Sequence, residues 1–256
     1  MKTPLKDLTR KTASTSYIKS LLKENSTVDT YCLYAGNCEL SIADDAHHVN
    51  SFTNSYVVYE FWRCLIEEPQ EIYQIISCDD FSFDSSEYFK VFQEKWFTYE
   101  NKFLRSALFF LLNRCSEDGL ISSGDLKQEN YNILAMKNVQ NFKKPDNFSI
   151  NYIKKPGQEL TTFIDLETKS DYVYIPVGRF TYNLFDDGKS YGPEETRINN
   201  RALKKILDTD KNIILHYNYH KALRNFYKKY NLTLIDRYGK MTADFQNAQE
   251  VIIANF

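Results

Sequence analysis

The sequence has few glycines and prolines, the residues that interrupt helices and strands, and it has no long apolar run. Only 8 glycines and 6 prolines occur among 256 residues, and no internal repeat recurs at a fixed period. Collagen-like, low-complexity and solenoid chains show the opposite features, so we expect a globular fold. No run approaches the roughly 18 apolar residues of a membrane span, and the start, MKTPLKDLTRKTAS, lacks the apolar core of a signal peptide. We therefore predict a cytoplasmic protein with no membrane partner.

Cysteine and histidine show no complete metal-binding or disulfide pattern. The cysteines are odd in number and form no C-x-x-C pair: Cys32, Cys38, Cys64, Cys78 and Cys115. Reduced thiols fit this spacing better than a disulfide framework or a zinc site. In HYNYH, His216 and His220 have the i, i+4 spacing that could place two imidazoles on one helix face, but no further ligands are identifiable. We predict no metal site.

Positive charge is also not in excess. The formal net charge is −2, whereas nucleic-acid-binding domains usually show a clear basic surplus. The stretch 137–155, KNVQNFKKPDNFSINYIKK, is the exception because it interleaves five lysines with aromatic residues. Lysines neutralise phosphates and rings stack on bases, so the stretch is either a nucleic-acid surface or a solvated loop. The candidate contacts here are Lys137, Phe142, Lys143 and Lys144.

Apolar periodicity predicts an α/β domain interrupted by a helical block. A helix is predicted at 16–25, a strand and glycine turn at 26–36, helical segments at 55–76 and 86–115, and a turn or hairpin at 116–133. Strands then follow at 161–166, 171–177 and 212–218, helices at 193–208 and 219–230, and closing strands at 232–238 and 248–256. This alternation indicates a largely parallel sheet that ends in an antiparallel hairpin, built from 1–56 and 166–256 around an insert at 57–165.

Five stretches share the order and spacing of one family's motifs. They are RKTASTSYIKSLLKEN, YCLYAGNCELS, FLRSALFFLLNRCSEDGL, DYVYIPVGRF, and NIILHYNYHKALRNFYKKYNLTLIDRY followed by QEVIIANF. In them the chain resembles the Dam-type DNA adenine-N6 methyltransferases, from about Lys11 to Phe256. The resemblance implies a Rossmann-like AdoMet-methyltransferase sheet, a helical target-recognition insert, S-adenosylmethionine as cofactor and DNA as partner. Fold does not fix function, so activity depends on the sites.

The cofactor loop departs from the family pattern, which is typically V-D-L-F-A-G-S-G-S. The acidic residue falls at Cys32 and the second glycine at Cys38, which leaves only Gly36. A side chain at the second glycine would obstruct the close backbone approach that a bound nucleoside needs. Bulky Tyr31, Tyr34, Cys38 and Glu39 around the remaining glycine fit a cleft that has been filled.

If the cleft is retained, the resemblance assigns four residues to the cofactor: Lys11, Tyr34, Gly36 and Thr53. Thr53 falls where the family carries the carboxylate that holds the ribose hydroxyls. Asp44 and Asp45 could replace that carboxylate, or they could form a solvated turn.

The catalytic loop departs further. The family's D-P-P-Y positions read Pro176, Val177, Gly178 and Arg179. In this chemistry an Asp or Asn oxygen accepts hydrogens from the amine of a flipped adenine, and an aromatic ring stacks on the base. Proline has no side-chain acceptor, although Arg179 or Phe180 could still stack on a base. An alternative register would make Asp171 and Tyr174 the catalytic pair, at the cost of turning a β-rich segment into a loop.

The leading hypothesis is a catalytically degenerate pseudo-methyltransferase that binds DNA or a protein partner and needs no cofactor. Arg114 joins the candidate DNA contacts, or it anchors the insert internally. One rival is an active S-adenosylmethionine-dependent DNA adenine-N6 methyltransferase with divergent motifs. A second rival is an assembly or interaction subunit with a filled cofactor cleft. The abundance of Tyr, Phe, Lys, Asn and Ile also suggests an AT-rich, phage-like source.

Overall fold

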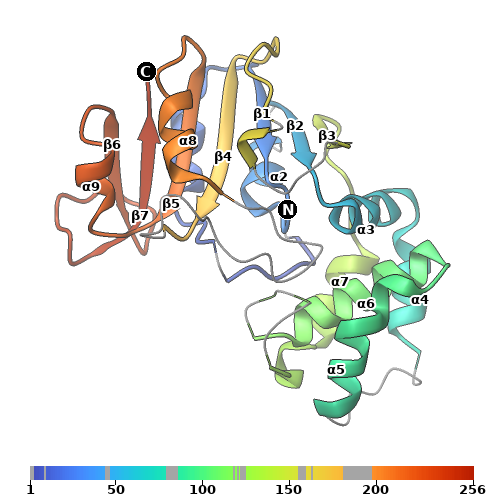
Figure 1. Cartoon of the computed structure of the whole chain (residues 1–256). Helices are drawn as coiled ribbons and strands as arrows, with labels where there is room; N and C mark the ends of the chain where they lie inside the picture. The colour runs from blue at the N-terminus through green and yellow to red at the C-terminus, as the bar shows by residue number, and fades with distance from the viewer. Residues whose placement is uncertain are drawn as a thin grey trace.

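A seven-stranded sheet forms the centre of the molecule, in the order β3-β2-β1-β4-β5-β7-β6 (Figure 1). The computed structural model describes residues 3–8, 10–43, 47–78, 86–117, 119, 121, 125–154, 160–162, 164–180 and 198–256. The strands are β1 Thr27–Tyr31, β2 His48–Thr53, β3 Phe148–Tyr152, β4 Tyr172–Gly178, β5 Asn212–Asn218, β6 Asn231–Asp236 and β7 Ala248–Ala254. The pairings from β3 to β5 are parallel, and β7 is antiparallel to both of its neighbours. The predicted Rossmann-like, largely parallel sheet with its closing antiparallel hairpin is confirmed.

Helices lie on the faces of this sheet and gather beyond one end of it. Those beside the sheet are α1 Thr15–Leu21, α2 Asn37–Ala43, α8 Asn200–Ile206 and α9 Leu223–Phe226. Those following β2 are α3 Tyr56–Glu67, α4 Pro69–Ile76, α5 Ser86–Lys95, α6 Lys102–Cys115 and α7 Ile133–Gln140. Short 3₁₀ turns occur at η1 Trp96–Thr98, η2 Gln128–Asn130 and η3 Leu160–Thr162. None of the helices in the described ranges is long and apolar enough to cross a membrane.

Local signals account for several of these boundaries. Pro69 stands in the first turn of α4, where its missing N–H costs nothing, so the helix predicted at 55–76 is two helices. Asn101 caps α6 by accepting from the amides of Phe103 and Leu104. From Ser106 to Asn113 every residue of α6 is buried, so this helix is the axis around which the others pack.

Three predicted elements differ in the structure. The strand predicted at 161–166 begins as η3, and the backbone of Asp165 then bonds to the Tyr31 hydroxyl rather than to another strand. The helix predicted at 219–230 is helical only at Leu223–Phe226. Finally, β3 lies inside the range predicted for the insert, 57–165, yet it pairs with β2 as an edge strand. Only Phe148 of this strand is buried, so its sequence lacks the alternation of apolar and polar residues that predicts a strand.

The core has two parts, one on each face of the sheet. In β4, Tyr172 and Tyr174 face one cluster while Val173, Ile175 and Val177 face the other. The first cluster continues without a break from sheet residues into the insert, where it includes Trp62 and Phe109. The insert is therefore packed as an extension of one face of the sheet.

Candidate cofactor cleft

The carboxyl ends of β1, β4 and β5 meet where open α/β sheets bind ligands. The loop after β1 runs through Gly36, whose φ of +68° is in the left-handed region that favours glycine. α2 begins at the next residue. The strand and glycine turn predicted at 26–36 are therefore confirmed. Cys32, at the start of the loop, also has a positive φ of 64°.

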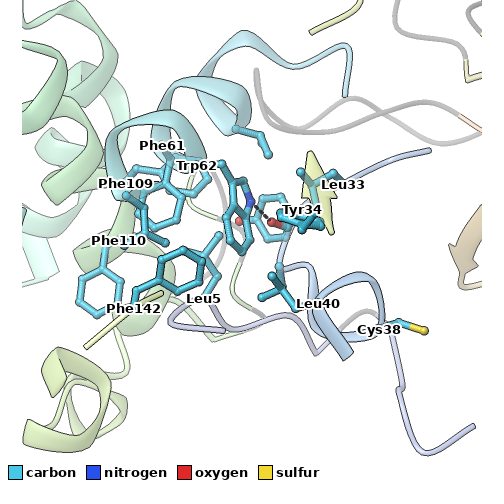
Figure 2. Packing of buried hydrophobic residues seen from close by; sticks show 14 of the residues in the cluster. Leu5, Leu33, Tyr34, Cys38, Leu40, Phe61, Trp62, Phe109, Phe110 and Phe142 are labelled. Carbon is cyan, nitrogen blue, oxygen red and sulfur yellow. Dashed lines mark hydrogen bonds between the residues drawn. The ribbon is translucent and has the colours of Figure 1, made fainter. Parts of the chain in front are cut away.

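Trp62 of α3 packs directly against this loop (Figure 2). Its indole Nε1 donates to the carbonyl oxygen of Tyr34 at 2.7 Å. A Cβ added at Gly36 would lie 2.9 Å from Trp62 Cζ2, so the indole occupies the space beside the glycine. The loop is thus supported from one side by a side chain of the insert.

Two residues assigned to the cofactor by resemblance are engaged elsewhere. Tyr34 is buried, and its hydroxyl donates to the carbonyl oxygen of Gly119 at 2.6 Å. Thr53 is 1% exposed, and its hydroxyl accepts from the amide of Ser55 at 3.2 Å. Both hydroxyls therefore bond within the protein. Asp44 and Asp45, the alternative carboxylates, lie outside the described residues.

The N-terminal segment crosses the same edge of the sheet. Arg10 donates to the carbonyl oxygen of Cys32 at 2.9 Å and lies 3.8 Å from a carboxylate oxygen of Asp7. The amide of Lys11 donates to Asn218 Oδ1 at 3.0 Å, and its ammonium group contacts Gln249 Oε1. Lys11 is therefore at the cleft, as the resemblance implies, but it is bonded to β5 and β7.

The space left between these elements is small. A cavity of about 20 Å³ is lined by the N-terminal segment, the loop at Gly36, the start of α2, and Tyr174, Pro176 and His216. One water molecule needs about 10–15 Å³ by this measure. The cavity has room for about one water.

Three ionisable side chains at or beside the cavity are buried. Glu39 in the first turn of α2 is 3% exposed, and burial raises the pKa of its carboxyl group, partly offset by Arg10. Burial also raises the thiol pKa of both Cys32 and Cys38 to about 12. These thiols are neutral at physiological pH and are packing residues rather than nucleophiles.

A buried polar network fixes the floor of the cleft. His216 Nδ1 lies 2.9 Å from the Tyr174 hydroxyl, and His216 Nε2 lies 2.9 Å from Glu250 Oε2. The Glu250 carboxylate also accepts from the amides of Ala13 and Ser14 at 2.8 and 2.9 Å. Burial alone would raise the pKa of Glu250, but the bonds from His216 and Ser14 outweigh it and lower the pKa. The network ties the N-terminal segment to β5 and β7.

This network corrects two interpretations of the sequence. His216 lies in β5 and His220 in the turn after it, so the two imidazoles do not share a helix face. In the described part of the chain no group of three or more His, Cys, Asp or Glu residues is placed to hold a metal ion. Asp171 precedes β4, at the amino ends of the parallel strands and so away from the cleft. Its carboxylate accepts a hydrogen bond from the amide of Thr27 at 2.8 Å. The register that pairs it with Tyr174 for catalysis is therefore wrong.

The family's catalytic positions form the end of β4. Pro176 and Val177 are buried strand residues, and the pairing with β5 shifts register between Pro176 and Gly178. Gly178 has a φ of +76°, and the exposed Arg179 follows it. Phe180 packs against the rings of Tyr217, His220 and Phe226, with centroids 5.4–6.0 Å apart. Pro176 is the one of these residues that lines the cavity.

The predicted nucleic-acid residues of the insert have different environments. Phe142 is 6% exposed and packs edge-on against Trp62 at 5.8 Å, instead of being available to a base. Lys144 donates to the carbonyl oxygens of Pro145 and Phe148 at 3.0 and 2.9 Å. Arg114 is partly buried, which lowers its pKa, and it donates to the carbonyl of Asn130 at 3.3 Å. Lys137 and Lys143 are exposed.

The sequence singles out several residues that line the cavity, among them Gly36, Cys38 and Pro176, but not the side chains that hold the loop and the N-terminal segment in place. Trp62 looked like one more apolar residue of an amphipathic helix. A better signal existed for His216 and Glu250, since each is a polar residue at an inward position of an otherwise apolar strand, NIILHYN or AQEVIIA. Buried polar side chains of this kind need partners, and here they partner each other.

Comparison with known proteins leaves the assignment at the level of the fold. No protein-family model matches the chain, and no curated protein matches it. A TehB-like SAM-dependent methyltransferase from Corynebacterium glutamicum aligns with a TM-score of 0.38 and 6% identity, covering 94% of this chain and 85% of that one. Coclaurine N-methyltransferase bound to N-methylheliamine and SAH aligns with a TM-score of 0.29 and 12% identity, covering 81% and 37%. These similarities are too low to carry an argument about the site, so the strand order is the basis of the fold assignment.

Proposed function

We propose that this chain is a catalytically degenerate Dam-like methyltransferase homologue that acts by binding DNA or a protein partner. The observation that carries the proposal is the size of the cleft. Its cavity measures about 20 Å³, whereas small-molecule and cofactor sites enclose about 300–1,000 Å³. The residues that line this cavity fit S-adenosylmethionine poorly, because the N-terminal segment borders the same space as the loop at Gly36, Tyr174 and Pro176 and leaves room for about one water molecule.

The end of β4 supports the same conclusion on chemical grounds. An exocyclic amine becomes nucleophilic when acceptor oxygens withdraw its hydrogens. Pro176 offers only its backbone carbonyl, and the neighbouring Val177 is apolar. The nearest buried polar side chains, Tyr174 and His216, are already bonded to each other. No step of methyl transfer can be assigned to these side chains.

The interaction-subunit hypothesis is favoured by the way in which the cleft is filled. Trp62 comes from the insert and Arg10 from the N-terminal segment, and both bond to backbone carbonyls of the same loop. Such contacts make the former cofactor loop a structural junction between three parts of the chain. A protein that has lost its cofactor in this way retains a rigid scaffold for a partner.

Calorimetric titration with S-adenosylmethionine tests the proposal. We expect no saturable heat up to millimolar ligand with the full chain. Saturable binding at micromolar concentrations would support the rival hypothesis of an active enzyme with divergent groups around Gly36 and Pro176. Transfer of a radiolabelled methyl group to adenine in duplex DNA, abolished by substitution between residues 171 and 180, would overturn the proposal outright.

A further inference from the structure

The turn between β6 and β7 lies at the carboxyl ends of the parallel strands, on the opposite side of the molecule from the insert (Figure 1). Because β7 is antiparallel to both β5 and β6, β6 runs in the same direction as β5. Its last residue, Asp236, is therefore at the edge where ligands bind in sheets of this kind. Residues 237–247 form the turn.

Two hollows lie beside this turn and share Met241 and Thr242. The first measures about 500 Å³ and is lined from α9 and β6 as well as from the turn. The second measures about 560 Å³ and is lined mainly by the turn itself. Six of the cationic and aromatic side chains that line them are called the hairpin surface here: Arg224, Lys228, Arg237, Tyr238, Lys240 and Phe245.

The hairpin surface is cationic. Among the described residues that line the two hollows, Asp236 is the only acidic one. Its Oδ1 accepts from the amides of Tyr238 and Lys240 at 2.8 and 2.9 Å, so this carboxylate stabilises the turn. The neighbouring Asp244 is used in the same way, because it accepts from the amide of Gln246 at 2.8 Å and from Asn247 Nδ2 at 2.6 Å. A polyanion is the complementary partner.

Each aromatic ring of the hairpin surface is paired with a guanidinium group. Arg237 lies 4.6 Å from the ring centroid of Tyr238, and Arg224 lies 4.9 Å from that of Phe245. Tyr238 is 69% exposed and Phe245 is 40% exposed. A ring that stacks on a base beside a cation that meets a phosphate is the arrangement used to bind single-stranded nucleic acids.

The turn is also held in place. Gly239 has a φ of +79°, and a Cβ there would lie only 2.3 Å from the carbonyl oxygen of Ala13. The turn therefore packs against the N-terminal segment, which Glu250 anchors. A surface fixed before binding loses less conformational entropy when it binds.

We propose that the hairpin surface binds single-stranded nucleic acid. Duplex DNA keeps its bases inside the stack, where Tyr238 and Phe245 cannot reach their faces, whereas a single strand presents them. An acidic peptide would match the charge but would leave the rings without a stacking partner. The inference concerns a surface separate from the cofactor cleft, and it holds whether or not the cleft admits a cofactor.

Fluorescence anisotropy with a labelled oligothymidylate of about 12 nucleotides tests this proposal. Tyr238→Ala should weaken binding about 5- to 150-fold, since stacking on an aromatic ring contributes that much per base, while Tyr238→Phe should bind like the wild type. The pair Arg237→Ala and Lys240→Ala should reduce the slope of log K against log salt by about 1.4, the value for two lost phosphate contacts on a single strand.

The matched control is the pair Lys90→Ala and Lys95→Ala, which removes the same charge from exposed positions of α5 in the insert. This control should bind the oligonucleotide like the wild type. The proposal is overturned if the control loses as much affinity as the hairpin variants, or if Tyr238→Ala binds normally. It is also overturned if duplex DNA binds as tightly as the single strand, or if polyglutamate competes as well as unlabelled oligonucleotide at equal charge. Unchanged urea midpoints confirm that the variants, all at exposed positions, remain folded.

Discussion

At the scale of single residues, Glu250 shows how a buried carboxylate can be kept ionised. It is 0% exposed, yet it accepts from two backbone amides and lies within bonding distance of His216. Burying a carboxylate is costly unless such partners compensate for lost hydration. Its lowered pKa means that the ionised form is favoured in the folded state.

We expect Glu250→Gln to destabilise the protein by about 2 kcal/mol at pH 7, because charge-assisted hydrogen bonds are replaced by neutral ones. A carboxyl group whose pKa is lowered on folding contributes stability above its unfolded pKa of about 4.3, and this contribution is lost as the pH falls through the folded pKa. The difference between wild type and variant, measured by urea unfolding, should therefore shrink below about pH 4.

Glu67→Gln is the control for this change. Glu67 also has a lowered pKa, through its bonds with Lys102 and Arg63, but its side chain is 37% exposed. Exposed ion pairs contribute less than about 1 kcal/mol. An equal loss in the two variants would contradict the role assigned to the Glu250 network.

Gly36 and Trp62 form a second residue-scale test. Gly36→Ala should cost about 1–2 kcal/mol from its positive φ and more from the 2.9 Å contact with the indole. Trp62→Phe removes the atoms responsible for that contact, so Gly36→Ala should cost about 1 kcal/mol less in the Trp62→Phe background. A double-mutant cycle by chemical denaturation measures this coupling. Strict additivity would show that the indole does not restrict the glycine in solution.

At the scale of elements, Asn113 of α6 holds the N-terminal segment to the insert. It accepts from the amide of Lys6 at 2.7 Å and donates to the carbonyl of Lys6 at 2.8 Å. It also lies 3.2 Å from the Tyr34 hydroxyl, which connects it to the cofactor loop. One buried side chain thus joins three segments that are far apart in sequence.

Asn113→Ala should destabilise the protein by about 2–4 kcal/mol, because several buried backbone groups lose their partner. The amide of Lys6 should then exchange with solvent faster than in the wild type, as followed by hydrogen exchange. Asn132→Ala, which removes the cap of α7 at an exposed position, should cost only about 1 kcal/mol and leave that amide protected. Equal protection of Lys6 in both variants would refute the assignment.

Elements were more predictable from the sequence than the site was. Strands such as IIL at 213–215 and YVYIPV at 172–177 have continuous apolar runs, which identify buried parallel strands. The edge strand β3 has no such run, and it was assigned to the insert. The loop at Gly36 and the N-terminal segment are held by Trp62, Arg10 and Glu250, whose partners lie 28, 22 and 34 or more residues away. No short sequence pattern predicts contacts between residues that lie so far apart along the chain.

At the scale of the whole molecule, the sheet and the insert share one hydrophobic core. The cluster that contains Val28 and Ile252 of the sheet also contains Trp62, Trp96 and Phe109 of the helices that follow β2. Two domains joined by a linker would each bury a separate core. Here one core crosses the boundary between the sheet and the insert. The insert is therefore an elaboration of the sheet domain rather than an independent folding unit.

A single cooperative unfolding transition is the expected consequence. The two tryptophans, Trp62 and Trp96, are both buried in the insert, so their fluorescence reports on that part of the chain. Far-UV circular dichroism reports on the sheet and helices together. We expect the two signals to give the same urea midpoint, because a shared core cannot be exposed on one side alone. Loss of tryptophan fluorescence at a lower urea concentration than the dichroism signal would show instead that the insert unfolds first, and that its packing on the sheet contributes little to the stability of either part.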